Sequence, residues 1–128
     1  MKKSNKPSPE IEIINYGRYN RWDRNSKALP EFLELTDTIE ADLDVEFGMI
    51  VEIRRARGRY LQFRIDHPPF TDADGNAEPS FEGTFRVRQN PYRNFLGDTI
   101  WAPVDDKRGE WTLSILHNED VFVKKSLL

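Results

Sequence analysis

The alternation of apolar and other side chains between residues 45 and 54 is the feature that most constrains the fold of this chain. Every second position is apolar, whereas Glu46, Glu52 and Arg54 lie between the apolar positions. A β-strand sends successive side chains to opposite faces, whereas on a helix these residues would spiral around the axis and bury nothing coherently. The segment is therefore predicted to be a strand whose core face carries Val45, Phe47, Met49, Val51 and Ile53.

The same alternation recurs along the rest of the chain. Further strands are predicted from Ile11 towards Tyr16 or Tyr19, over 61–65, around Phe85, around Ile100, over 111–115 and over 121–127. Gly58 suits the turn of a hairpin between the strands at 45–54 and 61–65, and His67-Pro68-Pro69 ends the second of them. Trp101 and Trp111 are both assigned to the core.

The stretch from residue 20 to residue 43 carries the weakest signal. Pro30 followed by Glu31-Phe32-Leu33-Glu34-Leu35 fits either one short helix near residues 30–35 or part of an irregular strand. Proline at a first helical position followed by glutamate is a recognised helix start. The pattern leaves both readings open.

Length and composition complete the fold prediction. With 128 residues and about seven short strands, the chain is expected to be all-β, with two packed antiparallel sheets and one core. A closed barrel is the alternative. Each strand is expected to keep one face in water. Residues 1–9 are predicted to be a disordered polar tail, and residues 10–128 a single β-sandwich domain.

Charge and targeting signals limit the classes of function. The chain has 19 basic and 22 acidic residues, which excludes a polyanion binder driven by bulk charge but not a local basic patch. No cysteine is present, so disulfide scaffolds, thiol nucleophiles and cysteine zinc sites are excluded. No apolar run approaches the ~20 residues of a membrane helix. We therefore expect a cytoplasmic protein with no membrane partner.

Several landmarks, taken in order, resemble a family of short bacterial proteins catalogued as a domain of unknown function. They are Tyr16-Gly17-Arg18-Tyr19, a Thr-rich segment from Thr36 that ends at Phe47-Gly48, His67-Pro68-Pro69, and Gly109 to Trp111 before a basic final strand. The resemblance spans residues 11–127 and implies an immunoglobulin-like sandwich, but no activity. Glu40 replaces a usual proline and Asp44 a usual glycine, so the turn before residue 45 is expected to differ.

No catalytic, cofactor or metal site is predicted. The segment from Asp72 to Glu78 resembles the start of a calcium loop, but Ala77 stands where a glycine is needed, and a solvated turn explains the composition better. His67 and His117 lack the spacing of zinc ligands. His67 is expected to be a polar residue that ends a strand.

The arginines around the first hairpin are the clearest charge feature. The candidates are Arg54, Arg55, Arg57, Arg59 and Arg64. Guanidinium groups could hold an anion or an acidic partner through bidentate contacts, or could be a solvated and partly salt-bridged hairpin tip. Nucleic acid is disfavoured as a partner because Tyr60 alone adjoins the cluster for stacking.

Three aromatic residues at a spacing of three form a second candidate surface. Tyr16, Tyr19 and Trp22 alternate with arginines and could stack on a sugar or form a protein contact. An odd spacing places neighbouring rings on opposite faces of a strand, so at least one ring should pack inward.

The leading hypothesis is a non-catalytic protein-interaction or accessory module of the bacterial cytoplasm, whose partner is another protein. Its contact surface would be a sheet edge, the arginine hairpin or the aromatic stretch. A homodimer formed through an edge strand is a further expectation. A small-ligand domain, with carbohydrate as the natural ligand, is the alternative, and an enzyme has the least support.

Overall fold

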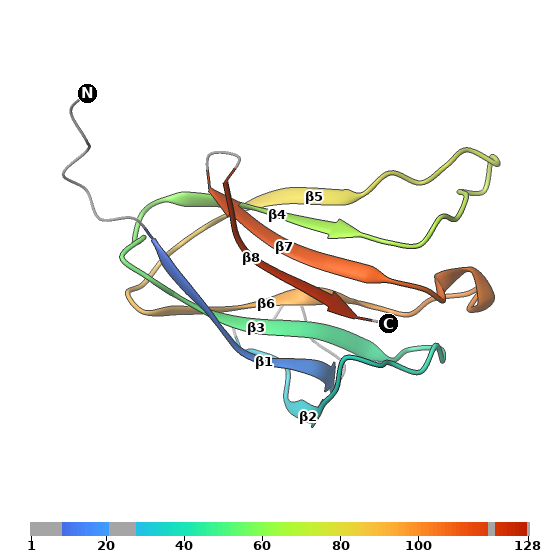
Figure 1. Ribbon diagram of the computed structural model, residues 1–128, viewed down its shortest axis with the longest axis horizontal. Coiled ribbons are helices and arrows are strands. Elements are labelled where there is room, and N and C mark those ends of the chain that lie inside the picture. The colour runs from blue at the N-terminus through green and yellow to red at the C-terminus, as the bar shows by residue number, and fades with distance from the viewer. Residues whose placement is uncertain (1–8, 21–27, 118–119, 128) are drawn as a thin grey trace.

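Two four-stranded antiparallel sheets face each other in the computed structural model, which describes residues 9–20, 28–117 and 120–127 (Figure 1). One sheet has the order β2-β1-β3-β6 and the other the order β5-β4-β7-β8. The elements are β1 (Glu10–Tyr19), β2 (Phe32–Leu35), β3 (Glu46–Arg54), β4 (Tyr60–Asp66), β5 (Phe81–Arg86), β6 (Tyr92–Thr99), the 3-10 turn η1 (Asp105–Lys107), β7 (Trp111–His117) and β8 (Asp120–Leu127). The predicted all-β sandwich is confirmed.

The main core lies between the two sheets. From β3, the predicted core face at Phe47, Met49, Val51 and Ile53 is almost completely buried. The facing sheet contributes Leu61 and Ile65 of β4 together with Trp111, Leu113 and Ile115 of β7. Alternation along each strand therefore produces the apolar layer that holds the sheets together.

The opposite face of β3 is buried as well, and the expectation that each strand keeps one face in water is wrong here. Ile50 packs with Tyr19 of β1 and Phe95 of β6 in a second, smaller cluster. The two rings meet edge to face at 4.8 Å between centroids. The Tyr19 hydroxyl donates to Asn15 Oδ1 at 2.6 Å, and burial raises its pKa.

A row of three glycines crosses this sheet, and one of them makes room for the Phe95 ring. Gly17, Gly48 and Gly97 are direct neighbours across β1, β3 and β6. An added Cβ would lie 2.3 Å from the Leu96 carbonyl oxygen at Gly48, and 2.6 Å from the Phe95 ring at Gly97. Side-chain-free backbone therefore lets an aromatic ring lie directly against the sheet.

Three local predictions are corrected by the structure. The helix alternative near residues 30–35 is wrong, because β2 pairs with the edge of β1. The strand expected around Ile100 ends earlier, at Thr99. Trp101 is 36 % exposed, so its assignment to the core is also wrong, whereas Trp111 is buried.

The turn before β3 accounts for one departure from the family pattern. Asp44 has a φ of 66°, which is the left-handed conformation that glycine adopts most easily. Aspartate is one of the few other residues that tolerate it. The turn can therefore keep this conformation without the glycine.

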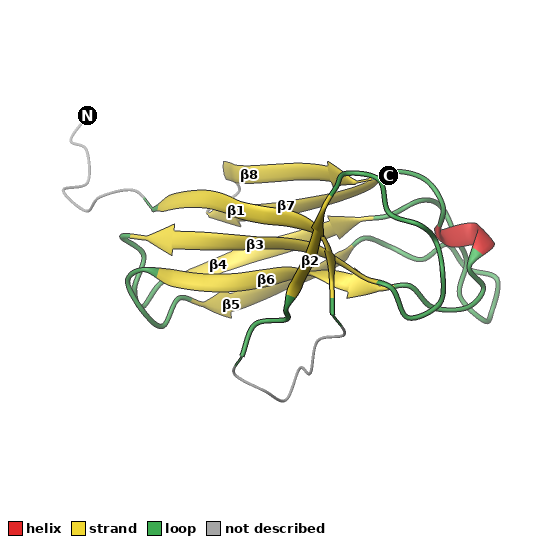
Figure 2. Ribbon diagram, turned by 90° about the horizontal axis from the view of Figure 1, so that it is seen from below, coloured by secondary structure: helices red, strands yellow, loops and turns green. Residues whose placement is uncertain are grey.

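The loops collect at the two ends of the long axis (Figures 1 and 2). The β3–β4 and β5–β6 connections lie at one end, on the left in Figure 1. The β2–β3, β4–β5 and β6–β7 connections lie at the other end, beside η1. Residues far apart in sequence meet at each end, and these ends carry the candidate binding surfaces.

Replacing Gly48 by alanine is expected to destabilise the domain. The new Cβ would overlap the backbone of β6, and such overpacking costs about 1–3 kcal/mol. Urea denaturation measures the loss. Gly75→Asn is the matched control, because Gly75 has positive φ but open space around it, and asparagine tolerates that conformation. Equal stability of Gly48→Ala and the wild type would contradict the close packing of β3 against β6.

Candidate binding surfaces at the two ends of the sandwich

Seven arginines gather at the end that carries the first hairpin. Backbone bonds join the two loops there: Gly58 donates to the Val87 carbonyl oxygen at 2.7 Å, and Val87 donates to Arg59 at 2.9 Å. The Arg55 amide also donates to Asn90 Oδ1 at 3.1 Å. We call this surface the arginine end; it comprises Arg54, Arg55, Arg57, Arg59, Arg86, Arg88 and Arg93.

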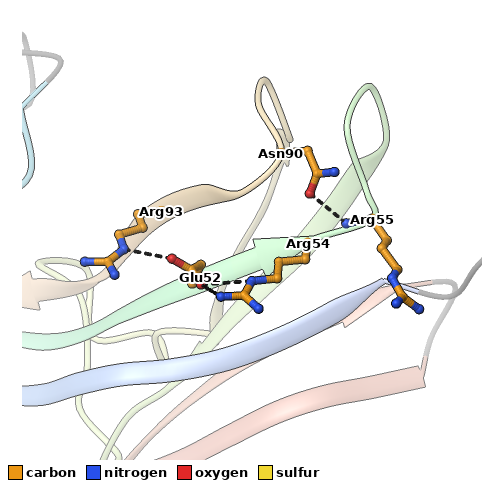
Figure 3. A network of polar contacts seen from close by, with 5 residues as sticks. All are labelled: Glu52, Arg54, Arg55, Asn90 and Arg93. Carbon is orange, nitrogen blue, oxygen red and sulfur yellow. Dashed lines mark hydrogen bonds and ion pairs between the residues drawn. The ribbon is translucent and has the colours of Figure 1, made fainter.

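Glu52 lies between Arg54 and Arg93 and binds both of them (Figure 3). Its Oε2 accepts from Arg54 Nε at 3.0 Å, and its Oε1 accepts from Arg93 Nε on the neighbouring strand at 3.1 Å. Hydrogen bonds from Arg54 and then Arg93 lower the pKa of Glu52, and the bond to Glu52 raises the pKa of Arg54. The carboxylate therefore holds two guanidinium groups in fixed positions.

The remaining arginines differ in how strongly they are neutralised. Arg55 lies 3.3 Å from Glu10 in an exposed ion pair. Arg57 and Arg88 are exposed, and no ion pair to either occurs within the described part of the chain. These two guanidinium groups are the best placed to meet an external anion.

The other sequence candidates lie elsewhere. Arg64 sits on the outer face of β4, where it pairs with Asp66 at 2.9 Å and approaches Glu82 at 3.8 Å. Tyr16 packs against the main core, and Tyr19 is buried on the opposite face of the same sheet. Trp22 lies outside the described residues. The structure thus joins four of the five candidate arginines but does not form an aromatic surface from Tyr16 and Tyr19.

At the opposite end of the sandwich, aromatic rings surround a buried lysine. The sequence patterns do not predict this cluster. Lys107 is 3 % exposed, and its ammonium donates to the Pro103 carbonyl oxygen at 3.0 Å and to Asp106. The ammonium also lies 4.5 Å from the Phe70 ring centroid and 4.6 Å from that of Trp101. These contacts compensate the burial of the charge.

A crevice of about 360 Å³ opens beside this cluster, between the first residues of β3 and β7. Phe47 and Trp111 line it, and their rings meet edge to face at 5.1 Å. The Trp111 indole donates to the Lys107 carbonyl oxygen at 2.8 Å, which fixes the ring beside η1. Ile39 and Ile100 extend the apolar lining.

His67 and the loop that follows it act as structural elements. One ring nitrogen of His67 lies 2.8 Å from the Pro79 carbonyl oxygen, and its ring stacks on Phe70 at 4.1 Å. Asp72 Oδ1 accepts from the amides of Asp74 and Asn76, as in an ordinary turn. Among the described residues, no group of three or more histidines and carboxylates could hold a metal ion.

Charge is distributed unevenly along the long axis of the molecule. The segments 54–59 and 86–93 contain seven arginines and no acidic residue, although Glu52 and Glu10 of the neighbouring strands pair with three of these arginines. At the opposite end, the segments 36–45, 71–80 and 101–110 contain ten acidic residues against Lys107 and Arg108. We call this second surface the acidic end; its carboxylates are Asp37, Glu40, Asp42, Asp44, Asp72, Asp74, Glu78, Asp105, Asp106 and Glu110.

Glu52→Gln is expected to reduce stability at neutral pH. Because the folded-state pKa of Glu52 is lowered, its charge stabilises the fold above the unfolded value of about 4.3, and this contribution is lost as pH falls through the folded pKa. Urea denaturation from neutral to acidic pH should show the difference from wild type shrinking. Glu110→Gln, which removes an exposed carboxylate outside the arginine end, is the matched control. A constant difference for Glu52→Gln would contradict the role of its charge.

Comparisons with known proteins agree with this fold. A solved structure of an immunoglobulin-like protein from Pseudomonas aeruginosa superimposes with a TM-score of 0.77 at 19 % identity, over 97 % of this chain and 98 % of that one. No curated protein matches this chain. No helix in the described residues is long and apolar enough to cross a membrane. The sequence profile of a domain of unknown function, DUF3859, matches residues 7–127, and the chain belongs to that family.

Proposed function

We propose that this domain is a non-catalytic interaction module that binds an acidic segment of a protein partner at its arginine end. The observation that supports this most is the convergence of seven arginines onto one end of the sandwich, four of them in the β3–β4 and β5–β6 loops and three in the adjoining parts of the strands. The backbone bonds between the loops hold the loop backbones together before a partner arrives, which lowers the ordering cost of binding. Carboxylates suit guanidinium groups because both of their oxygens can accept bonds.

An acidic protein segment fits this surface better than a nucleic acid does. The chain is acidic overall, and its opposite end would repel a long polyanion. Tyr60, 62 % exposed on β4 next to Arg59, is the one exposed ring that adjoins the arginine hairpin in the described chain. Nucleic-acid binding without base readout usually requires several rings for stacking.

The alternative hypothesis, a small-ligand domain, also has a feature in its favour, the crevice beside Trp111. The carbohydrate version of that hypothesis loses support, because Tyr16 and Tyr19 pack against the two cores instead of forming an exposed platform. A cytoplasmic location and a homodimer through an edge strand stay predictions.

The double substitution Arg57→Ser with Arg88→Ser is expected to weaken binding of a short labelled peptide of alternating glutamate and glycine. Two exposed charges contribute roughly threefold to thirtyfold in affinity at low ionic strength. Fluorescence anisotropy measures the dissociation constant. Arg64→Ser removes an arginine outside the arginine end and should leave the constant unchanged.

Two results would count against this function. Equal losses for the double variant and for Arg64→Ser would mean that binding is not localised at the arginine end. Tighter binding of a thymidine oligonucleotide of matched charge would assign the surface to nucleic acid.

A further inference from the structure

The crevice at the acidic end has the volume of a small-molecule site. It lies at the opening between the sheets, with residues 39–42 on one side and residues 107–109 on the other. Its volume of about 360 Å³ falls in the lower part of the range of ligand pockets, roughly 300–1,000 Å³. The buried rings of Phe47 and Trp111 belong to the starts of two strands, so this part of the lining is rigid.

The charges around the crevice indicate which ligands it favours. The two basic residues that line it already have acidic neighbours: Lys107 contacts Asp106, and Arg108 lies 3.7 Å from Asp105. Glu40 and Asp42 also line the crevice, and the described chain supplies no ion pair to either. After internal pairing, the charge left at the crevice is therefore negative.

The wider surroundings reinforce that preference. Ten of the twelve charged residues in the three segments of the acidic end are carboxylates, so the local potential attracts cations and repels anions. Aromatic faces at this end already accept a cation, because the Lys107 ammonium lies over Phe70 and Trp101. Apolar walls beside uncompensated carboxylates match a molecule with a hydrophobic body and a single positive charge.

We propose that the crevice binds a small organic amine, with its apolar body against Phe47 and Trp111 and its ammonium group beside Glu40 and Asp42. Ile39 and Ile100 complete the apolar contact. This site lies at the opposite end from the arginine end and does not depend on it. A neutral or anionic molecule of the same shape would lose the attraction of the carboxylates or would be repelled by them.

Three ligands of one shape test the proposal: 2-phenylethylamine, 2-phenylethanol and phenylacetate. Two-dimensional NMR of the labelled full chain follows each titration. The amine is expected to give saturable shifts at residues 39–42 and 107–109 and at the Trp111 indole. The alcohol should bind about tenfold more weakly, because two exposed carboxylates contribute on that order. Phenylacetate should not bind.

Variants separate the charge effect from the cavity. Glu40→Gln with Asp42→Asn should weaken amine binding roughly fivefold to tenfold, with no effect on the alcohol. Ala41→Leu should abolish binding of both, because the larger side chain fills part of the crevice. Glu78→Gln removes an acidic-end carboxylate that does not line the crevice, and should preserve amine affinity.

The proposal is overturned if the alcohol binds as tightly as the amine, or if the amine gives no saturable shifts at millimolar concentration. It is also overturned if the shifts map away from the crevice. Failure of the arginine-end peptide experiment would leave this result unaffected, since the two experiments use different ends, ligands and variants.

Discussion

Burial of β3 on both faces is the constraint on which the rest of this structure depends. Its inner face supplies the centre of the main core, and its outer face supports Tyr19 and Phe95 through Ile50. A buried polar residue on such a strand needs a hydrogen-bond partner elsewhere in the fold. Glu46 accepts from the Thr99 hydroxyl at 2.9 Å, and Glu52 binds Arg54 and Arg93. The strand thus links the packing of one sheet to the geometry of the arginine end.

Because the strands are antiparallel, basic and acidic residues collect at opposite ends of the sandwich, although the net charge of the chain is small. Each connection returns the chain to one end or the other, so charges that are dispersed in sequence are sorted by the loop in which they lie. The arginines of the β3–β4 and β5–β6 connections meet at one end, and the carboxylates of three longer connections meet at the other (Figure 1). The formal net charge of −3 is small and does not reveal this separation of basic from acidic residues. A partner therefore meets different chemistry depending on the end that it approaches.

Sequence periodicity predicted the parts of the fold that depend on neighbouring residues. Alternation from Val45 to Ile53 identified the central strand and its core face, because side-chain direction there is a local property of extended backbone. The covered outer face could not be read in the same way. Glu46 and Glu52 are polar, and although Arg54 is close in sequence, their partners on β6, Thr99 and Arg93, lie more than 40 residues away.

The candidate surfaces were also harder to predict from the sequence, because their residues come from segments that lie far apart in the chain. Arg54, Arg55, Arg57 and Arg59 were visible as a run, whereas Arg86, Arg88 and Arg93 join them only through pairing of the strands and loops in the fold. The three glycines look isolated in the chain and form a row only in the sheet. Lys107 reads as a turn residue, and nothing local indicates that its side chain is buried between aromatic rings.

The central claim, that charge is separated between the two ends, can be measured without any ligand. Paramagnetic relaxation of each amide by a cationic and by an anionic nitroxide cosolute reports the electrostatic potential near that residue. The account predicts stronger relaxation by the anionic probe over residues 54–59 and 86–93, and by the cationic probe over residues 36–45, 71–80 and 101–110. Equal relaxation by the two probes at both ends would contradict it.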